Sequence, residues 1–131
     1  MQKMKNAFFT LLAAALFLAA CGGSGGSTAA QAVEEYYQAI VAQDAAKVDA
    51  LVCPDFEEPA HVELDSFQGV KANLEGFSCK PAGMEGSLTL VTCEGKIVAT
   101  YGSETMDFPL ADRVHQVQNV DGVWTVCGSG T

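Results

Sequence analysis

Basic side chains are scarce in this sequence. Its 131 residues hold 7 lysines and arginines against 16 aspartates and glutamates, which gives a formal net charge of −9. A protein that binds nucleic acid, or that grips anionic lipid by charge, needs a basic patch. The composition therefore argues against nucleic acid as a partner, and the scattered acidic residues predict a solvated surface.

Motifs that carry common chemistries are also lacking. The sequence has no Cys-x-x-Cys pair, no HExxH metal pair, no glycine loop for phosphate and no nucleophile elbow. A zinc site that combines cysteines with His61 or His115 is disfavoured, because their spacing fits no usual pattern. We therefore expect no cofactor and no metal.

The longest apolar run lies at the N-terminus. Lys3 and Lys5 precede an uncharged run over residues 7–20. A run of about 14 residues is too short to cross a bilayer as a helix, which takes roughly 20. Positive charge, then an apolar run, then small residues is the order of a secretory signal. Residues 1–20 are therefore predicted to be a signal peptide.

The apolar run ends in Leu18-Ala19-Ala20-Cys21. These four residues resemble the lipobox of bacterial lipoproteins. The resemblance implies a diacylglyceryl group on the Cys21 thiol, cleavage before Cys21 and acylation of the new amine, by palmitate for example. Because two or more acyl chains anchor a protein stably, it implies a lipoprotein on the extracytoplasmic face of the cell membrane, with membrane lipid as its partner.

A glycine and serine tract separates Cys21 from the rest of the chain. Residues 22–27 hold no apolar side chain, and such a tract is a random coil with ends roughly 13 Å apart. We expect residues 21–27 to be a lipidated tether and residues 28–131 to be one domain. Loss of residues 1–20 leaves 5 basic and 16 acidic residues, a net charge of −11.

Three helices are expected at the start of the domain. Thr28 with Gln31 has the form of a capping box, and apolar residues then recur at helical spacing. The first helix is expected to run from Thr28 to near Gln43. Asp44 is expected to cap a second helix that Pro54 ends. Pro59 is expected to be the first residue of a third helix that Gly69 ends.

Beyond Gly69 the apolar residues alternate with polar ones, which predicts strands. We expect a bulge at 75–76, a bend at 94–95 and one strand from 104 to 117. Turns are predicted at 81–86, at 102–103 and, most clearly, at Asp121-Gly122. Helices followed by an antiparallel meander make an α+β domain.

Several of these features occur together in an order known from one superfamily. They are Ala32-Val33, Tyr36-Tyr37, Ile40, Asp44, Leu51-Val52 and Asp121-Gly122-Val123-Trp124. This order resembles small secreted members of the nuclear transport factor two-like superfamily, which includes SnoaL-like proteins with a cystatin-like cone. The resemblance implies N-terminal helices packed on a strongly curved antiparallel sheet, with an open end. Members include isomerases, dehydratases and domains without known chemistry, so the fold fixes no function.

Four cysteines remain in the domain, and an even count in an exported protein favours two disulfides. We favour Cys53 with Cys127, between the second helix and the last strand, and Cys79 with Cys93, between neighbouring strands. The pairing of Cys53 with Cys79 and of Cys93 with Cys127 is a rival. This rival pairing is kept because a hairpin that turns at 81–86 would place Cys79 opposite a residue well before Cys93.

Catalysis would need a titratable side chain aimed into the cone. His115 alternates in register with Val117 and is expected to point inward, whereas His61 is expected to be solvated. A small isomerase or dehydratase is therefore kept as an alternative function. The titratable candidates are Tyr36, Tyr37, His61, Tyr101, Asp112 and His115.

A non-catalytic binding module is the leading interpretation. The open end of such a cone takes small hydrophobic ligands, although the same side chains are equally suited to filling the core. A third interpretation is an interaction protein or a structural subunit of an envelope complex, marked by an exposed apolar patch. The expected lining residues are Tyr36, Tyr37, Ile40, Tyr101, Phe108, His115 and Trp124.

Overall fold

The computed structural model describes residues 28–131, so the predicted signal peptide, Cys21 and the tether lie outside the described residues. In this part of the chain no helix has the length and apolar character needed to cross a membrane. The elements are α1 (Ala29–Ala42), α2 (Ala45–Leu51), a 3-10 turn (Pro54–Phe56), α3 (Glu57–Ser66), β1 (Lys71–Glu85), β2 (Leu88–Tyr101), β3 (Glu104–Pro109), β4 (Val114–Val120) and β5 (Val123–Gly130).

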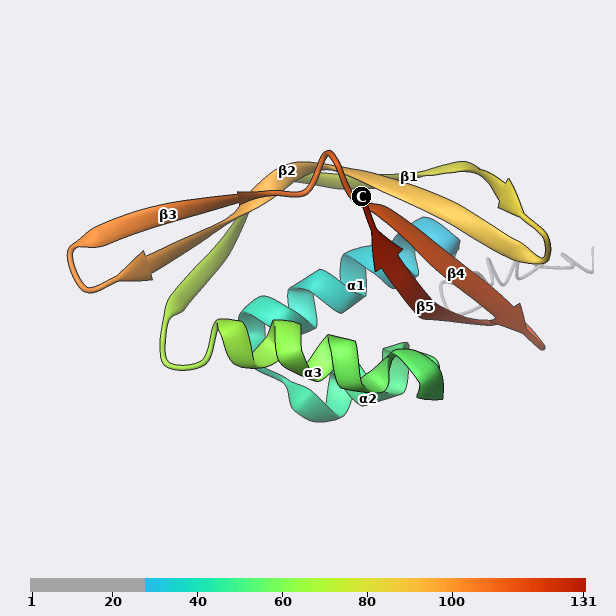
Figure 1. The fold of residues 1–131 in the computed structure, drawn as a ribbon, viewed down its shortest axis with the longest axis horizontal. Coiled ribbons are helices and arrows are strands. Elements are labelled where there is room, and N and C mark those ends of the chain that lie inside the picture. The colour runs from blue at the N-terminus through green and yellow to red at the C-terminus, as the bar shows by residue number, and fades with distance from the viewer. Residues whose placement is uncertain (1–27) are drawn as a thin grey trace, which may run out of the picture.

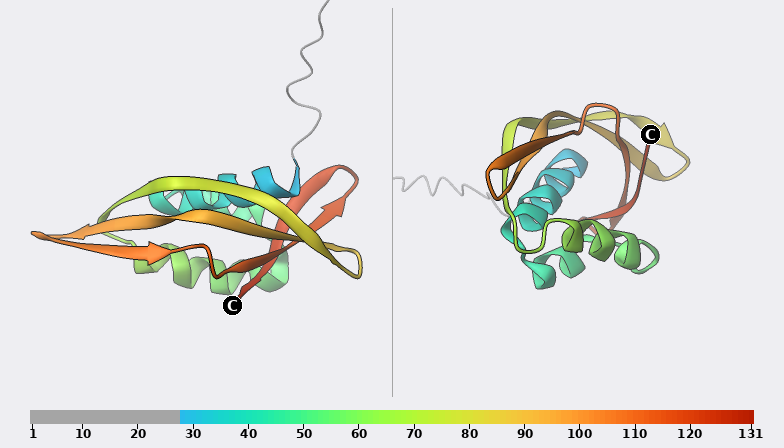
Figure 2. Two further views of the ribbon diagram at one scale, coloured as in Figure 1. Left: turned by 90° about the horizontal axis from the view of Figure 1, so that it is seen from above. Right: turned by 60° about the vertical axis from the view of Figure 1, so that its left-hand side comes forward.

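The domain is α+β, as predicted, with three helices followed by a five-stranded antiparallel sheet. The strand order is β1-β2-β4-β5, and β3 pairs with β2. The sheet curves around α1, which lies against its concave face, while α2 and α3 lie on the far side of α1 (Figures 1 and 2). The core therefore forms on both sides of α1, against the inner face of the sheet and against α2 and α3.

The first helix forms as its sequence predicts. The Thr28 backbone N–H donates to the Gln31 side chain at 2.9 Å, and the Gln31 N–H donates to the Thr28 hydroxyl at 3.2 Å. At the other end Gln43 adopts a left-handed conformation, with φ of 58°, that stops the helix. Between these ends Val33 and Ile40 are fully buried against the sheet.

The third helix begins earlier than predicted. It starts at Glu57, because the 3-10 turn Pro54–Phe56 continues directly into it. Pro59 lies inside its first turn, where a missing N–H loses no hydrogen bond. The sequence therefore indicated the helix correctly but misplaced its start by two residues.

The β1–β2 hairpin is longer than predicted. The expected turn at 81–86 is wrong, because β1 runs to Glu85 and the chain reverses directly after it. A register shift between Pro81 and Gly83 takes up the irregular residues while the strand continues. The predicted bulge at 75–76 is confirmed by a second shift, between Glu75 and Ser78.

The expected strand from 104 to 117 is in fact two strands. The β3 strand pairs with residues 96–101 of β2, whereas β4 pairs with residues 89–92 of the same strand. Residues 110–113 connect them, with Leu110 fully buried and its N–H donating to the Gly95 carbonyl at 3.0 Å. This connection brings Arg113 to the concave side of the sheet, beside α1 and α3.

Candidate functional site

Five polar side chains converge between α1, α3 and the sheet. Tyr36 and Tyr37 come from α1, Glu63 comes from α3, Arg113 precedes β4 and His115 lies within β4. They form one continuous hydrogen-bonded network. Within the described domain, His115 is the one buried polar residue of the core.

The direction of each hydrogen bond around His115 follows from its partners. Its Nδ1 lies 3.3 Å from the Val91 carbonyl oxygen, which can only accept, so Nδ1 carries the proton. Its Nε2 therefore accepts from the Tyr37 hydroxyl at 2.8 Å. The Tyr37 oxygen in turn accepts from Nη1 of Arg113 at 3.1 Å. Arg113, Tyr37 and His115 thus form a one-way chain of donors.

Glu63 completes the network from the helical side. Its Oε2 accepts from the Tyr36 hydroxyl at 2.8 Å, and its Oε1 pairs with Nη1 of Arg113. The side chains of Glu63 and Arg113 keep 15% and 32% of their exposure, so the ion pair reaches the surface while both phenol rings are fully buried.

Burial fixes the protonation states inside the network. It raises the pKa of Tyr37 to about 12, with the Glu63 charge adding to the rise and Arg113 opposing it. It also raises the pKa of Tyr36, again with help from Glu63. Burial lowers the pKa of His115, against the opposing effect of its hydrogen bond to Val91. At neutral pH both phenols and the imidazole are therefore uncharged.

Neighbouring side chains keep the guanidinium of Arg113 protonated. Burial by itself would lower the pKa of the guanidinium, but Tyr37 and Glu63 outweigh this effect and raise it. The network therefore holds one positive and one negative charge, paired with each other. Such a pair can bind a polar group of a ligand through its remaining hydrogen-bonding positions.

An open hollow of about 260 Å³ lies over the ion pair. Its floor holds Glu63 and Arg113, and Phe56 and Pro59 supply an apolar wall. Residues 129–131 complete the lining. His115 does not line this hollow and is fully buried. The hollow therefore offers an ion pair and an apolar wall to a ligand, but no free base.

The structure separates the residues expected to line one pocket. Tyr36, Tyr37 and His115 meet in the network, and His115 points inward as its alternation predicted. Ile40 is fully buried in the core. The other three lie elsewhere: Phe108 packs on Phe67 with ring centroids 5.3 Å apart, Tyr101 is 38% exposed, and Trp124 lies on β5 beside a separate hollow.

The two remaining titratable candidates lie outside the network. Asp112 is exposed in the connection before β4, and His61 contacts Asp49 on the outer side of the helices. Two members of the network, Glu63 and Arg113, were not among the expected site residues. Their signals were nevertheless present, because Arg113 is the only arginine in the chain and Glu63 flanks the buried stripe of Ala60 and Leu64.

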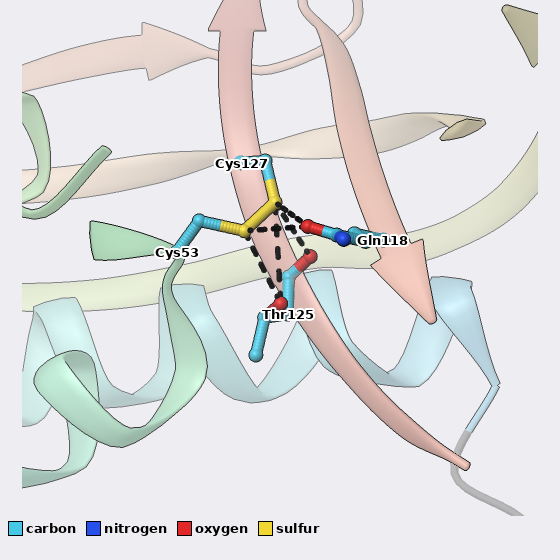
Figure 3. Close-up of a disulfide and its surroundings, with 4 residues drawn as sticks. All are labelled: Cys53, Gln118, Thr125 and Cys127. Atoms are coloured by element: carbon cyan, nitrogen blue, oxygen red, sulfur yellow. Dashed lines mark hydrogen bonds between the residues drawn. A yellow bond between two sulfur atoms is a disulfide. The ribbon is translucent and has the colours of Figure 1, made fainter. Parts of the chain in front are cut away.

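The disulfides join Cys53 to Cys127 and Cys79 to Cys93, which are the favoured pairs. The Cys53 N–H donates to the Val126 carbonyl at 2.9 Å, which holds the segment between α2 and the 3-10 turn against β5. Figure 3 shows the bond between these two layers, with Gln118 and Thr125 beside the sulfurs. Cys79 lies directly opposite Cys93 because the hairpin turns after Glu85.

Comparison with known proteins shows a likeness in fold. No protein-family model matches the chain, and no curated protein matches it. A similar solved structure is the solution structure of a SEC-C motif containing protein from Rhodopseudomonas palustris. It is 14% identical, with a TM-score of 0.52, and the match covers 83% of this chain and 84% of that one. At this identity the likeness concerns the fold alone.

Proposed function

We propose that this protein is an extracytoplasmic lipoprotein whose domain binds a small ligand without transforming it. An acylated Cys21 holds it to the cell membrane, and residues 22–27 act as the tether. The ligand occupies the hollow over Glu63 and Arg113. The lipobox-like Leu18-Ala19-Ala20-Cys21 and two disulfides of the kind found in exported proteins support this location.

One observation carries the binding role: the hollow exposes an ion pair beside an apolar wall, while the reactive nitrogen of His115 is sealed. Nε2 of His115 already accepts from Tyr37, and the residue is fully buried. A base that a substrate cannot reach does not start a reaction. The hollow suits a small amphipathic molecule whose polar group bonds to Arg113 or Glu63 and whose apolar part lies on Phe56 and Pro59.

A nuclear transport factor two-like cone is the finer fold that we propose. The curvature of the sheet around α1 and the position of the helices on its concave side support it (Figure 2). Within such a cone, the fully buried Tyr36, Tyr37 and Ile40 fill the interior. The proposed binding site is therefore the hollow beside the network and not the space between α1 and the sheet.

Contact with an envelope protein is a second candidate. The β2–β3 hairpin projects past the helices (Figure 1), and β3 has a strand partner on one side only. Met106 on β3 is 51% exposed, and Tyr101 at the end of β2 is 38% exposed. Exposed apolar side chains on an edge strand are typical of a docking surface.

Native mass spectrometry of the protein extracted from its own membrane tests these proposals together. We expect loss of residues 1–20, added acyl mass, loss of two hydrogens for each disulfide, and a small retained ligand. Mapping of amide NMR shifts should then place that ligand around Glu63 and Arg113. A chain that keeps its first twenty residues, or that stays wholly in the aqueous fraction, contradicts the anchoring.

The same mass measurement and a turnover assay separate the other functions. A copurified protein without a small ligand would favour the second candidate. Turnover of a hydroxy ketone or an enone that disappears in His115→Gln would contradict the non-catalytic role and favour the isomerase or dehydratase alternative.

A further inference from the structure

Three metal-ligating side chains meet on the outer side of the helices. The donor atoms of Asp49, Glu57 and His61 all lie within 4.8 Å of one another. Asp49 comes from α2, whereas Glu57 and His61 come from α3. Nε2 of His61 is 2.5 Å from Oδ1 of Asp49. Two helices thus bring one imidazole and two carboxylates to one point.

Helical spacing separates this group from the hollow. Glu57 and His61 are four residues apart, so they lie one turn apart on the same face of α3. Pro59 and Glu63, which line the hollow, are each two residues further along. At 3.6 residues per turn that is a rotation of about 200°. The two sites therefore lie on opposite faces of α3.

The negative charge of this group is not offset by lysine or arginine. Among the ion pairs of residues 28–131, Lys47 pairs with Glu35 and Arg113 with Glu63, and none joins a lysine or arginine to Asp49 or Glu57. His61 contacts one of the two carboxylates, that of Asp49. A cation drawn to this acidic domain would find these carboxylates without a strong competitor.

We propose that Asp49, Glu57 and His61 bind one divalent transition-metal ion, with Zn²⁺ the best fit. Zinc accepts imidazole nitrogen together with carboxylate oxygen, whereas calcium and magnesium prefer oxygen alone. Tetrahedral bonds of about 2.1 Å place donor atoms about 3.4 Å apart, so small side-chain movements suffice to bind zinc here. Asp49 and Glu57 are exposed and His61 is half-buried, so water can fill the fourth position.

This site is independent of the proposed ligand hollow, and it was not expected from the sequence. The expectation of no metal rested on the missing HExxH pair and on the spacing of cysteines and histidines. It did not consider Asp49, which lies eight residues before Glu57, on another helix, and completes the group only in the fold. A bound ion would join α2 to α3 on the side away from the sheet.

Isothermal titration of the purified, disulfide-bonded protein with ZnCl₂ tests the proposal. We expect one Zn²⁺ per chain, and a rise in melting temperature when zinc is added. His61→Ala and Asp49→Asn should each weaken binding by at least about tenfold, because loss of a direct ligand costs no less than loss of a second-shell partner. Glu58→Gln, which removes an adjacent exposed carboxylate outside the group, should bind zinc as the natural chain does.

Zinc affinities of the variants and NMR shifts test whether these three residues form the site. Unchanged zinc affinity in both His61→Ala and Asp49→Asn, or equal loss in Glu58→Gln, would overturn the site and indicate adventitious binding to an acidic surface. The substituted side chains are at least partly exposed, so melting temperatures in zinc-free buffer should match that of the natural chain. Amide NMR shifts caused by Zn²⁺ should lie in α2 and α3. Shifts centred on Glu63 and Arg113 would contradict the proposal and implicate the hollow.

Discussion

The hydroxyl of Tyr37 donates to Nε2 of His115 across 2.8 Å, although the two residues are 78 positions apart in the chain. The bond joins α1 directly to β4. Both partners are fully buried, so neither can exchange the other for water. The contact therefore fixes how the first helix sits against the sheet, and it ties the ion pair of Glu63 and Arg113 to the core.

Removal of this hydroxyl should be costly. We expect Tyr37→Phe to lower the free energy of unfolding by about 1–3 kcal/mol, because His115 and Arg113 each lose a buried partner. Urea denaturation followed by circular dichroism measures the change. Tyr101→Phe removes a hydroxyl from a side chain that is 38% exposed, and it should change stability by less than about 0.5 kcal/mol. Equal effects in the two variants would contradict a structural role for the network.

Stability should fall as the pH drops below the ordinary histidine range. Burial lowers the pKa of His115 below 6.5, so the unfolded chain binds a proton there that the folded chain does not. The free energy of unfolding therefore decreases as the pH falls from about 6.5 toward the pKa of folded His115, by at most about 1.4 kcal/mol per pH unit. Urea denaturation across pH 5–7 measures this slope.

One variant shows whether His115 is the source of that slope, because His115→Gln should flatten it. An imidazole NMR signal of His115 that titrates at or above pH 6.5 would refute the explanation independently of that variant.

The disulfides should stabilise the domain to different degrees. Cys53 and Cys127 are 74 residues apart, whereas Cys79 and Cys93 are 14 apart. In the chain-entropy model the longer loop contributes about 4 kcal/mol and the shorter about 3 kcal/mol. Replacement of each pair by serines, with denaturation as the readout, should therefore cost more for the longer loop. The reverse order would mean that the unfolded chain is not the main source of the effect.

Gly95 should tolerate no side chain. It has a φ of +90°, and a Cβ there would meet the Glu75 carbonyl oxygen and lie 2.6 Å from the Gly76 carbonyl carbon. We expect Gly95→Ala to cost more than the roughly 1–3 kcal/mol of backbone strain alone. Gly86→Ala is the matched control, since Gly86 also has a positive φ, +59°, but nothing lies within 4 Å of its Cβ position. Melting temperatures that fall equally would contradict a close contact between β1 and β2.

Local signals predicted much of this fold. The capping box at Thr28 and the turn at Asp121-Gly122 depend only on neighbouring residues, and both formed as expected. The break between β3 and β4 could not be predicted in the same way. β3 and β4 pair with successive segments of one edge of β2, and residues 110–113 leave the pairing between them, so the break depends on contacts with β2 and not on neighbouring residues alone.

The candidate site was predictable only in part. The helical spacing of Tyr36 and Tyr37 and the alternation at His115 showed that these side chains point inward. Glu63 and Arg113 were missed because a charged residue on a helix flank or in a connection is usually solvated. Their importance comes from each other, since the charges meet only when α3 and the start of β4 lie side by side.

The disulfide between Cys53 and Cys127 should hold the domain together after the chain is cleaved. A protease that cleaves once, anywhere from residue 54 to residue 126, produces two fragments that remain covalently attached. The exposed tip of the β2–β3 hairpin lies within this interval. A nicked molecule would therefore keep its C-terminal strand attached to the helices, and the fragments would separate only after reduction.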